Sequence, residues 1–256
     1  MRLFKYVEPE RVDILENERI AITPPERFKD PFEFRPQKTL PDQTYFKQAI
    51  KEAAEQEQRE SPEFFRGVDA KRISKIEESF AKNNIVPFAE QFQDFLPGET
   101  SKHFGVLCLS TNNNENLMWY HYADGHRGFV IEFESEHKDF QEFGTPYEVI
   151  YSDKPSSYNF ENPSPDFWRV KPFYLKYEAE YRILFRLPNS TPYQTGGKPL
   201  FLARLPRACV KAVYLGHRME KGGHEKILQL LKGTSVSKFD AIPSREDYTL
   251  SFREIK

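Results

Sequence analysis

From Phe104 onward the sequence is a succession of short strand-like segments that do not alternate regularly with helices. The apolar run FGVLCLS is typical of a buried strand, and the segments RGFVIEFES and YEAEYRILFRL suit two further strands. Neither a P-loop nor a dinucleotide-binding glycine pattern accompanies them. We therefore predict an α+β fold with a mostly antiparallel or mixed sheet that contains 104–110, 128–134 and 178–186, with helices packed beside it.

The segment from about 43 to 95 has a different composition. Its stretches QTYFKQAIKEAAEQEQRE and DAKRISKIEESFAKN are rich in Ala, Glu and Lys, with apolar residues at helical spacing. A chain of 256 residues is long enough for one large domain. We predict a single α+β domain spanning 1–256, in which this segment is a helical insertion packed beside the sheet.

The charges of the chain are nearly balanced, with 37 Lys and Arg against 39 Asp and Glu. This balance gives no overall electrostatic attraction for nucleic acid. No apolar run approaches the roughly 18 residues of a membrane span, and the charged segment MRLFKYVEPER is unlike a signal peptide. Cys108 and Cys209 lie in apolar runs and are interpreted as small buried hydrophobes, without a disulfide framework. We expect a cytoplasmic protein with no membrane contact.

The segment YEAEYRIL, residues 177–184, raises a question about charge. If it is a strand throughout, Glu178, Glu180 and Arg182 share one face, and the two carboxylates lie only about 7 Å apart. The two carboxylates repel each other unless water solvates them or their charges serve a function. One interpretation is a surface strand whose charges partly compensate, and the other is a functional site at a sheet edge or cleft.

A second candidate is the aromatic segment MWYHYADGHRG. On a helix, Met118, His121 and Tyr122 share one face, while Trp119 and Tyr120 turn elsewhere. One interpretation is an aromatic core with a histidine satisfied by the backbone. The other is a wall, formed by 119–122, that stacks on a planar ring and hydrogen-bonds to it.

Other constellations are weaker. The Asp-Pro pair of FKDPFE fixes a turn, and Glu33 shortly after it is interpreted as part of that turn rather than as a catalytic group. His121 and His126 are joined by a glycine turn without a cysteine pair nearby, whereas a zinc site needs three or four convergent ligands. We predict no metal, and no signature of a serine or cysteine nucleophile is present.

Several segments in a fixed order resemble a known family. They are LFKYV, ITPPERFKDPFEF, LCLSTNNNENLMWYHYADGHRGFVIEF, VIYSDKP, VKPFYLKYEAEYRI and VKAVYLG. Between Leu3 and about Gly216 the chain resembles the bacterial family catalogued as domain of unknown function 2971, some members of which look like phage-resistance proteins. The resemblance implies a bacterial protein with a role in phage defence.

The order of the segments is also similar, more distantly, to ADP-ribosyltransferases. That similarity implies an ADP-ribosyltransferase-like fold and NAD as the substrate. The N-terminal strand would contact NAD through Lys5 or Tyr6, where the best-known classes have Arg or His. Glu178 and Glu180 match the Glu-x-Glu of arginine-modifying members, in which the second glutamate serves the ribose and the first acts on the acceptor.

Polar groups embedded in otherwise strand-like or aromatic segments are expected to line one cleft, and they are Lys5, Tyr6, His121, Tyr122, Glu178, Glu180 and Arg182. The acceptor is left open among a protein, a nucleic acid and a small molecule. The competing hypothesis is a non-enzymatic binding module of a defence or toxin–antitoxin system, with an antitoxin or defence protein as its partner. A nuclease is a third hypothesis, against which the lack of a metal constellation and of overall basicity weigh.

Overall fold

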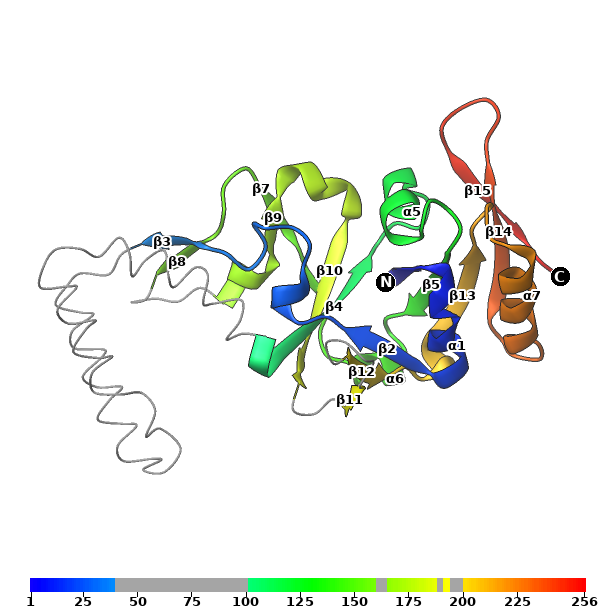
Figure 1. Ribbon diagram of the computed structural model, residues 1–256, viewed down its shortest axis with the longest axis horizontal. Coiled ribbons are helices and arrows are strands. Elements are labelled where there is room, and N and C mark those ends of the chain that lie inside the picture. The colour runs from blue at the N-terminus through cyan, green and yellow to red at the C-terminus, as the bar shows by residue number, and fades with distance from the viewer. Residues whose placement is uncertain (40–100, 160–164, 188–190, 194–199) are drawn as a thin grey trace, which may run out of the picture.

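The computed structural model describes residues 1–39, 101–159, 165–187, 191–193 and 200–256 (Figure 1). The predicted helical insertion at about 43–95 lies outside the described residues. The single domain that would include it therefore stays a prediction.

An eight-stranded sheet forms the centre of the molecule. Its strands, in spatial order, are β15 (Leu250–Glu254), β14 (Ser237–Pro243), β13 (Val210–Leu215), β5 (Phe129–Glu134), β1 (Arg2–Val7), β4 (Phe104–Ser110), β10 (Glu180–Arg186) and β6 (Tyr147–Glu148). All neighbours are antiparallel except β13 and β14, which are parallel. The prediction of an α+β fold with a mostly antiparallel or mixed sheet is confirmed, as is the presence of β4, β5 and β10 in it.

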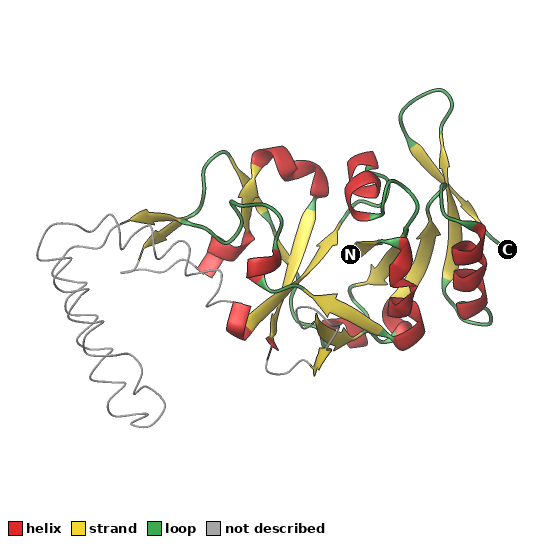
Figure 2. Cartoon of the chain, in the orientation of Figure 1, coloured by secondary structure: helices red, strands yellow, loops and turns green. Residues whose placement is uncertain are grey.

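The remaining described elements are short (Figure 2). The smaller sheets consist of β11 (Thr191–Tyr193), β12 (Leu200–Arg204) and β2 (Arg19–Ile22), of β3 (Gln37–Thr39) with β8 (Ser157–Asn159), and of β7 (Ile150–Ser152) with β9 (Val170–Pro172). The helices are α1 (Asp13–Asn17), α5 (Asn116–Tyr122), α6 (Lys138–Gln141), α7 (Lys221–Leu230) and the 3₁₀ turns η1 (Pro9–Val12), η2 (Pro25–Arg27), η3 (Pro165–Arg169), η4 (Phe173–Glu178) and η6 (Arg207–Cys209). None of the helices in the described ranges is long and apolar enough to cross a lipid bilayer.

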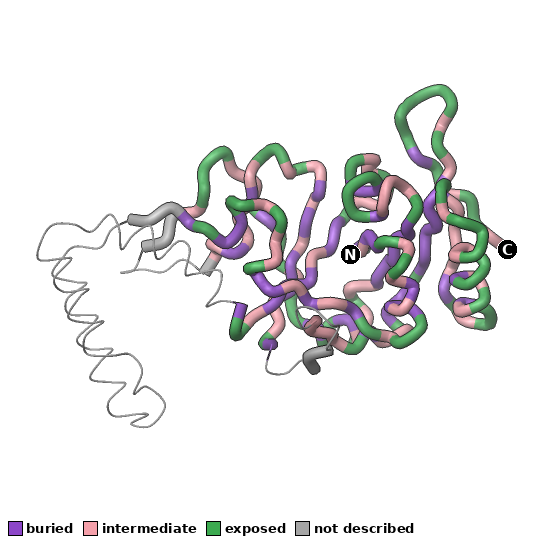
Figure 3. The backbone as a smooth tube through the Cα atoms, viewed as in Figure 1, coloured by how far each residue is buried: buried purple, intermediate pink, exposed green. Residues whose placement is uncertain are grey.

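The two faces of the sheet carry two separate cores, because successive side chains of a strand point to opposite faces. Leu3 and Ile131 belong to the larger core, which α1, α6 and α7 cover. Phe4 and Tyr6 belong to the smaller one, which includes Trp119 of α5. Buried backbone follows the central strands (Figure 3). The side of the sheet under α5 is thus covered by few helical residues, and this side carries the pocket described below.

The central strands β1 and β4 diverge along their length. β1 pairs with β5 over six residues but with β4 only at Phe4 and Ser110, whereas β4 pairs with β10 over seven residues. The side chain of Lys5 lies between the diverging strands, and its Nζ donates a hydrogen bond to the Cys108 carbonyl at 3.1 Å. The sheet therefore opens beside residues from both strands.

Gly128 allows a close approach of two backbone segments at the start of β5. A Cβ atom at Gly128 would lie 2.0 Å from the Val7 carbonyl oxygen, and one at Gly216 would lie 2.2 Å from the His126 carbonyl oxygen. Both obstacles are backbone atoms, which cannot rotate away. These two glycines therefore hold the turn after α5 against the ends of β1 and β13.

We predict that Gly128→Ala destabilises the protein by about 3 kcal/mol, because the added methyl group must displace backbone. Gly222→Ala in α7 is the matched control, since a Cβ there meets open space. Removing a helical glycine should leave stability unchanged or raise it by up to about 1 kcal/mol. Urea unfolding of the two variants measures the difference, and equal midpoints would contradict the packing described here.

Candidate functional site

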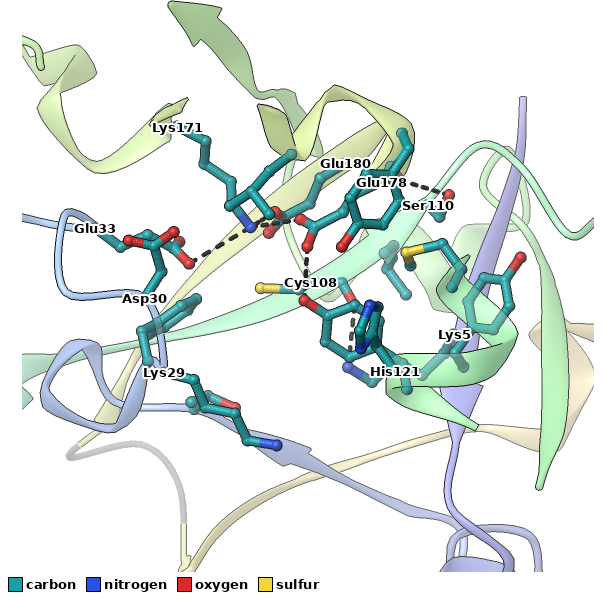
Figure 4. Close-up of a pocket in the computed structure, with 18 of the residues that line it drawn as sticks. Lys5, Lys29, Asp30, Glu33, Cys108, Ser110, His121, Lys171, Glu178 and Glu180 are labelled. Atoms are coloured by element: carbon teal, nitrogen blue, oxygen red, sulfur yellow. Dashed lines mark hydrogen bonds and ion pairs between the residues drawn. The ribbon is translucent and has the colours of Figure 1, made fainter. Parts of the chain in front are cut away.

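A pocket of about 600 Å³ opens beside the diverging strands β1 and β4 (Figure 4). Its walls come from β1, the 23–33 segment, β4, α5 and the segment that runs from β9 to the start of β10. The predicted site residues that line it are Lys5, Tyr6, His121, Tyr122, Glu178 and Glu180. Arg182 does not line it and is fully buried behind it. The structure thus brings six of the seven predicted residues to one pocket.

Helix α5 presents one face to the pocket, as its spacing predicts. Met118, His121 and Tyr122 line the pocket, whereas Tyr120 is 64% exposed. The expectation that Trp119 belongs to the ring-binding wall is wrong. Trp119 is fully buried, donates from its indole nitrogen to the Asn113 carbonyl at 2.7 Å and stacks on His126. The aromatic wall at α5 is therefore His121 and Tyr122, with Tyr177 at 6.5 Å from the His121 ring.

The strand predicted over 177–184 begins later than expected. Glu178 is the last residue of η4, Ala179 has a left-handed backbone with φ of 42°, and Glu180 is the first residue of β10. This conformation costs an L-residue roughly 1–2 kcal/mol. Hydrogen bonds hold it, since the Ala179 N–H donates to the Lys176 carbonyl and the Ala179 carbonyl accepts from the Thr111 N–H. Glu178 therefore does not share a strand face with Glu180 and Arg182.

The two glutamates nevertheless converge, because both bind one ammonium group. The Lys171 Nζ lies 2.5 Å from a Glu178 carboxylate oxygen and 2.8 Å from a Glu180 oxygen. It also lies 3.4 Å from a Glu33 oxygen. All four side chains are nearly fully buried. The buried ammonium group of Lys171 thus offsets the repulsion between Glu178 and Glu180 that the sequence indicated.

Arg182 completes this cluster from behind the pocket. Its Nε donates to Glu180 at 2.8 Å and its Nη2 pairs with Glu33. Its Nη1 donates to the Trp168 carbonyl, and the rings of Phe28 and Phe34 lie against the guanidinium. Arg182 therefore holds Glu180 ionised, and its fully buried guanidinium has no open face for a phosphate.

Glu33 is a member of the cluster that the sequence interpretation missed. Its N–H closes the expected turn by donating to the Asp30 carbonyl, but its carboxylate is buried against Lys171 and Arg182. The available signal was its position between Phe32 and Phe34, which is unusual for a solvated turn residue. A carboxylate inside an aromatic segment needs a partner when it is buried.

The two pocket glutamates differ in how they hold protons. Burial raises the pKa of Glu178, and this outweighs the attraction of Lys171. Burial also acts to raise the pKa of Glu180, but the charges of Arg182 and Lys171 outweigh it and hold that pKa well below its usual range. The Tyr122 hydroxyl donates to Glu178 at 2.6 Å, and burial together with Glu178 raises the pKa of Tyr122. Glu180 is thus a fixed anion, and Glu178 is the carboxylate suited to proton transfer.

The cluster as a whole carries an excess of negative charge. Three carboxylates, those of Glu33, Glu178 and Glu180, face the two cations Lys171 and Arg182. When all three carboxylates are ionised, one negative charge is left uncompensated. Glu178 and Glu180 line the pocket, so this charge lies at its wall.

Cys108 also lines the pocket but is not a suitable nucleophile. Burial and the neighbouring Glu180 raise the pKa of its thiol well above the usual range. The thiolate is the reactive form of cysteine, and this environment disfavours it. Cys108 is half-buried and Cys209 is buried, so the prediction of two small buried hydrophobes is confirmed only for Cys209.

Comparisons of the chain with protein-family models, with curated proteins and with solved structures found no match. The resemblances to domain of unknown function 2971 and to ADP-ribosyltransferases therefore stay predictions. What the pocket can do follows from its charges and its shape.

We predict that Arg182→Met destabilises the protein by about 3–5 kcal/mol, because it leaves Lys171 as the single cation that pairs with the three buried carboxylates of the cluster. Arg253→Met is the matched control, since Arg253 is 71% exposed in its ion pair with Asp240. An exposed pair contributes about 1 kcal/mol or less. Chemical denaturation of both variants tests this, and an equal loss in the two would show that the cluster does not support the fold.

We also predict a difference in acid sensitivity. The folded-state pKa of Glu180 lies below its ordinary value of 4.5, so the unfolded chain binds more protons at this residue. Glu180 therefore stabilises the fold above about pH 4.5, and this contribution is lost as the pH falls. Glu178 acts in the opposite sense, because its pKa is raised.

The test compares the free energy of unfolding of wild type and Glu180→Gln between about pH 6 and about pH 3. The variant should lose less stability on acidification, because glutamine does not titrate. The same slope in both proteins would show that Glu180 is not held as an anion.

Proposed function

We propose that the protein is an NAD-dependent ADP-ribosyltransferase and that the pocket binds NAD as its substrate. The observation that carries the proposal is the pair Glu178 and Glu180 at the pocket wall, in a buried cluster that has one excess negative charge when all three of its carboxylates are ionised. A buried anion beside a reacting centre is strongly stabilising when positive charge develops there.

The charge matches the chemistry of a glycosidic bond. Cleavage between the ribose and nicotinamide develops positive charge on the ribose, in an oxocarbenium-like transition state. Glu180 is the carboxylate that we assign to this charge, because Arg182 and Lys171 keep it ionised. Nicotinamide leaves with the electron pair of the broken bond, and the acceptor forms the new bond to the ribose carbon.

The acceptor must lose a proton in this reaction, and we assign that proton to Glu178. Its raised pKa brings proton transfer closer to neutral pH, which favours general base catalysis. The Tyr122 hydroxyl fixes one of its oxygens and Lys171 the other. The acceptor itself, whether a protein, a nucleic acid or a small molecule, is not defined by these contacts.

The rest of the pocket is compatible with a dinucleotide. Its volume of about 600 Å³ lies within the usual range of cofactor sites. The rings of Tyr122, Tyr177 and Phe28 offer surfaces on which a nicotinamide or adenine ring can stack. Tyr6 is less available for polar contacts, because its hydroxyl already donates to the Asn112 carbonyl at 2.8 Å.

The competing proposal is a non-enzymatic binding module in a phage-defence or toxin–antitoxin system. It is favoured by aromatic side chains that are exposed near the pocket. Tyr174 is 64% exposed and donates its hydroxyl to Asp30, which lines the pocket, and Phe173 beside it is 49% exposed. In that case the partner is an antitoxin or another defence protein, which binds the exposed aromatic side chains. The buried ion cluster then only stabilises the fold beneath them.

The two proposals are separated by incubating the purified protein with labelled NAD and candidate acceptors. We predict that Glu180→Gln lowers the rate of NAD cleavage by about 100-fold or more, because one electrostatic contact of the transition state is lost. NAD binding should change little, since this charge matters mainly in the transition state. Glu178→Gln should impair transfer to the acceptor more than NAD hydrolysis.

Glu246→Gln is the matched control, because Glu246 is exposed and distant in sequence from the cluster. Retained NAD binding by each variant shows that it is folded. Absence of NAD binding at about 1 mM, or equal activity of Glu180→Gln and wild type, would contradict the enzyme and favour the binding module.

A further inference from the structure

The pocket has a second set of charges that the ion cluster does not use. Lys5, Arg27 and Lys29 line it together with the carboxylates. Within the part of the chain that the structure describes, none of these three cations forms an ion pair. Figure 4 shows Lys5 and Lys29 away from the side where Lys171 meets the glutamates.

Arg27 is the most informative of the three. It ends the turn η2, whose backbone is closed by the hydrogen bond from the Arg27 N–H to the Pro24 carbonyl at 3.0 Å. Its side-chain Nε is buried and has no hydrogen-bond partner among the described residues. A buried donor without an acceptor costs free energy, which a ligand acceptor in the pocket would recover.

Lys29 and Lys5 form no ion pair with a carboxylate of the described residues. Asp30, next to Lys29, accepts instead from the Phe32 N–H at 2.7 Å and from the Tyr174 hydroxyl at 3.0 Å. Lys5 donates to a neutral carbonyl, which occupies one of its three N–H groups. Both ammonium groups therefore keep donors for a ligand.

The three carboxylates of the cluster do not compensate these cations either. Glu180 is taken by Arg182 and Lys171, and Glu178 by Lys171 and Tyr122. The pocket is consequently bipolar, with an excess negative charge at one wall and unpaired positive charges at another. A ligand that matches it has an anionic group separated from the part that meets the carboxylates.

We propose that Arg27 and Lys29, with Lys5, form a subsite for the diphosphate of a nucleoside diphosphate group. Phosphate oxygens suit it because a guanidinium offers paired donors in the geometry of a phosphate, and an ammonium acts as a point charge. Two linked phosphates present enough oxygens for three cations. The inference rests on the proposed function for the rest of the ligand, since NAD contains such a diphosphate, but the subsite itself needs only the phosphates.

The test is calorimetric titration of the full chain with ADP, inorganic pyrophosphate and adenosine. Wild type should bind ADP and pyrophosphate, more weakly as salt is added, and should bind adenosine much less well than ADP. Arg27→Met should weaken ADP binding about tenfold or more, because a charge-assisted contact is lost. Lys29→Met should weaken it in the same direction.

Arg245→Met is the matched control, because Arg245 is exposed on the loop between β14 and β15, and it should bind ADP as wild type does. Arg27→Met removes a desolvated donor without a partner, so its melting temperature should stay equal to that of wild type or rise. No binding of ADP or pyrophosphate at millimolar concentration overturns the subsite. So does ADP binding that is unchanged in Arg27→Met and Lys29→Met.

Failure of the subsite and failure of the enzyme give different results. If ADP binds through Arg27 and Lys29 but labelled NAD is not cleaved, the subsite is correct and ADP-ribosyl transfer is wrong. If NAD is cleaved but ADP binding does not respond to either variant, the enzyme is correct and the diphosphate lies elsewhere.

Discussion

The ammonium group of Lys171 is the contact on which the rest of the site depends. It meets Glu33 of the segment after η2, Glu178 at the end of η4 and Glu180 at the start of β10, so it joins two parts of the described chain that are far apart in sequence. Taking charged groups out of water is expensive, and only close, mutual pairing offsets the cost. Because Lys171 is itself part of β9, the cluster ties this small strand to the edge of the large sheet. The position of the pocket wall is thus decided by electrostatics as much as by apolar packing.

The strands of the site were predictable, but the contacts between them were not. The apolar run of β4 and the alternation in β5 and β10 locate the sheet, since they follow directly from the period of a strand. The spacing of Met118, His121 and Tyr122 likewise identifies the face of α5 that lines the pocket. These features are local, so the sequence contains them in full.

The features that could not be predicted all involve residues far apart in the sequence or an unusual backbone. Ala179 has a left-handed backbone, which makes strand β10 begin only at Glu180. A glycine would have indicated such a conformation, but an alanine does not. Arg182 and Glu33 are 149 residues apart, and nothing local indicates that they meet. The parallel strand β14 was also missed, because its segment SKFDAIP is only partly buried and ends in proline. Packing between distant segments decides each of these cases.

The pairing of Lys171 with Glu178 and Glu180 also closes the 171–180 segment into a short arch. An arch closed at its base by ion pairs has a fixed span, so inserting or deleting one residue within it would pull the carboxylates away from the ammonium. The outer side chain of Phe173 is under no such constraint, since it is exposed. The arch can therefore vary in what it displays to the surroundings while its length and shape stay the same, and relatives of this chain should differ there in residue identity but not in spacing.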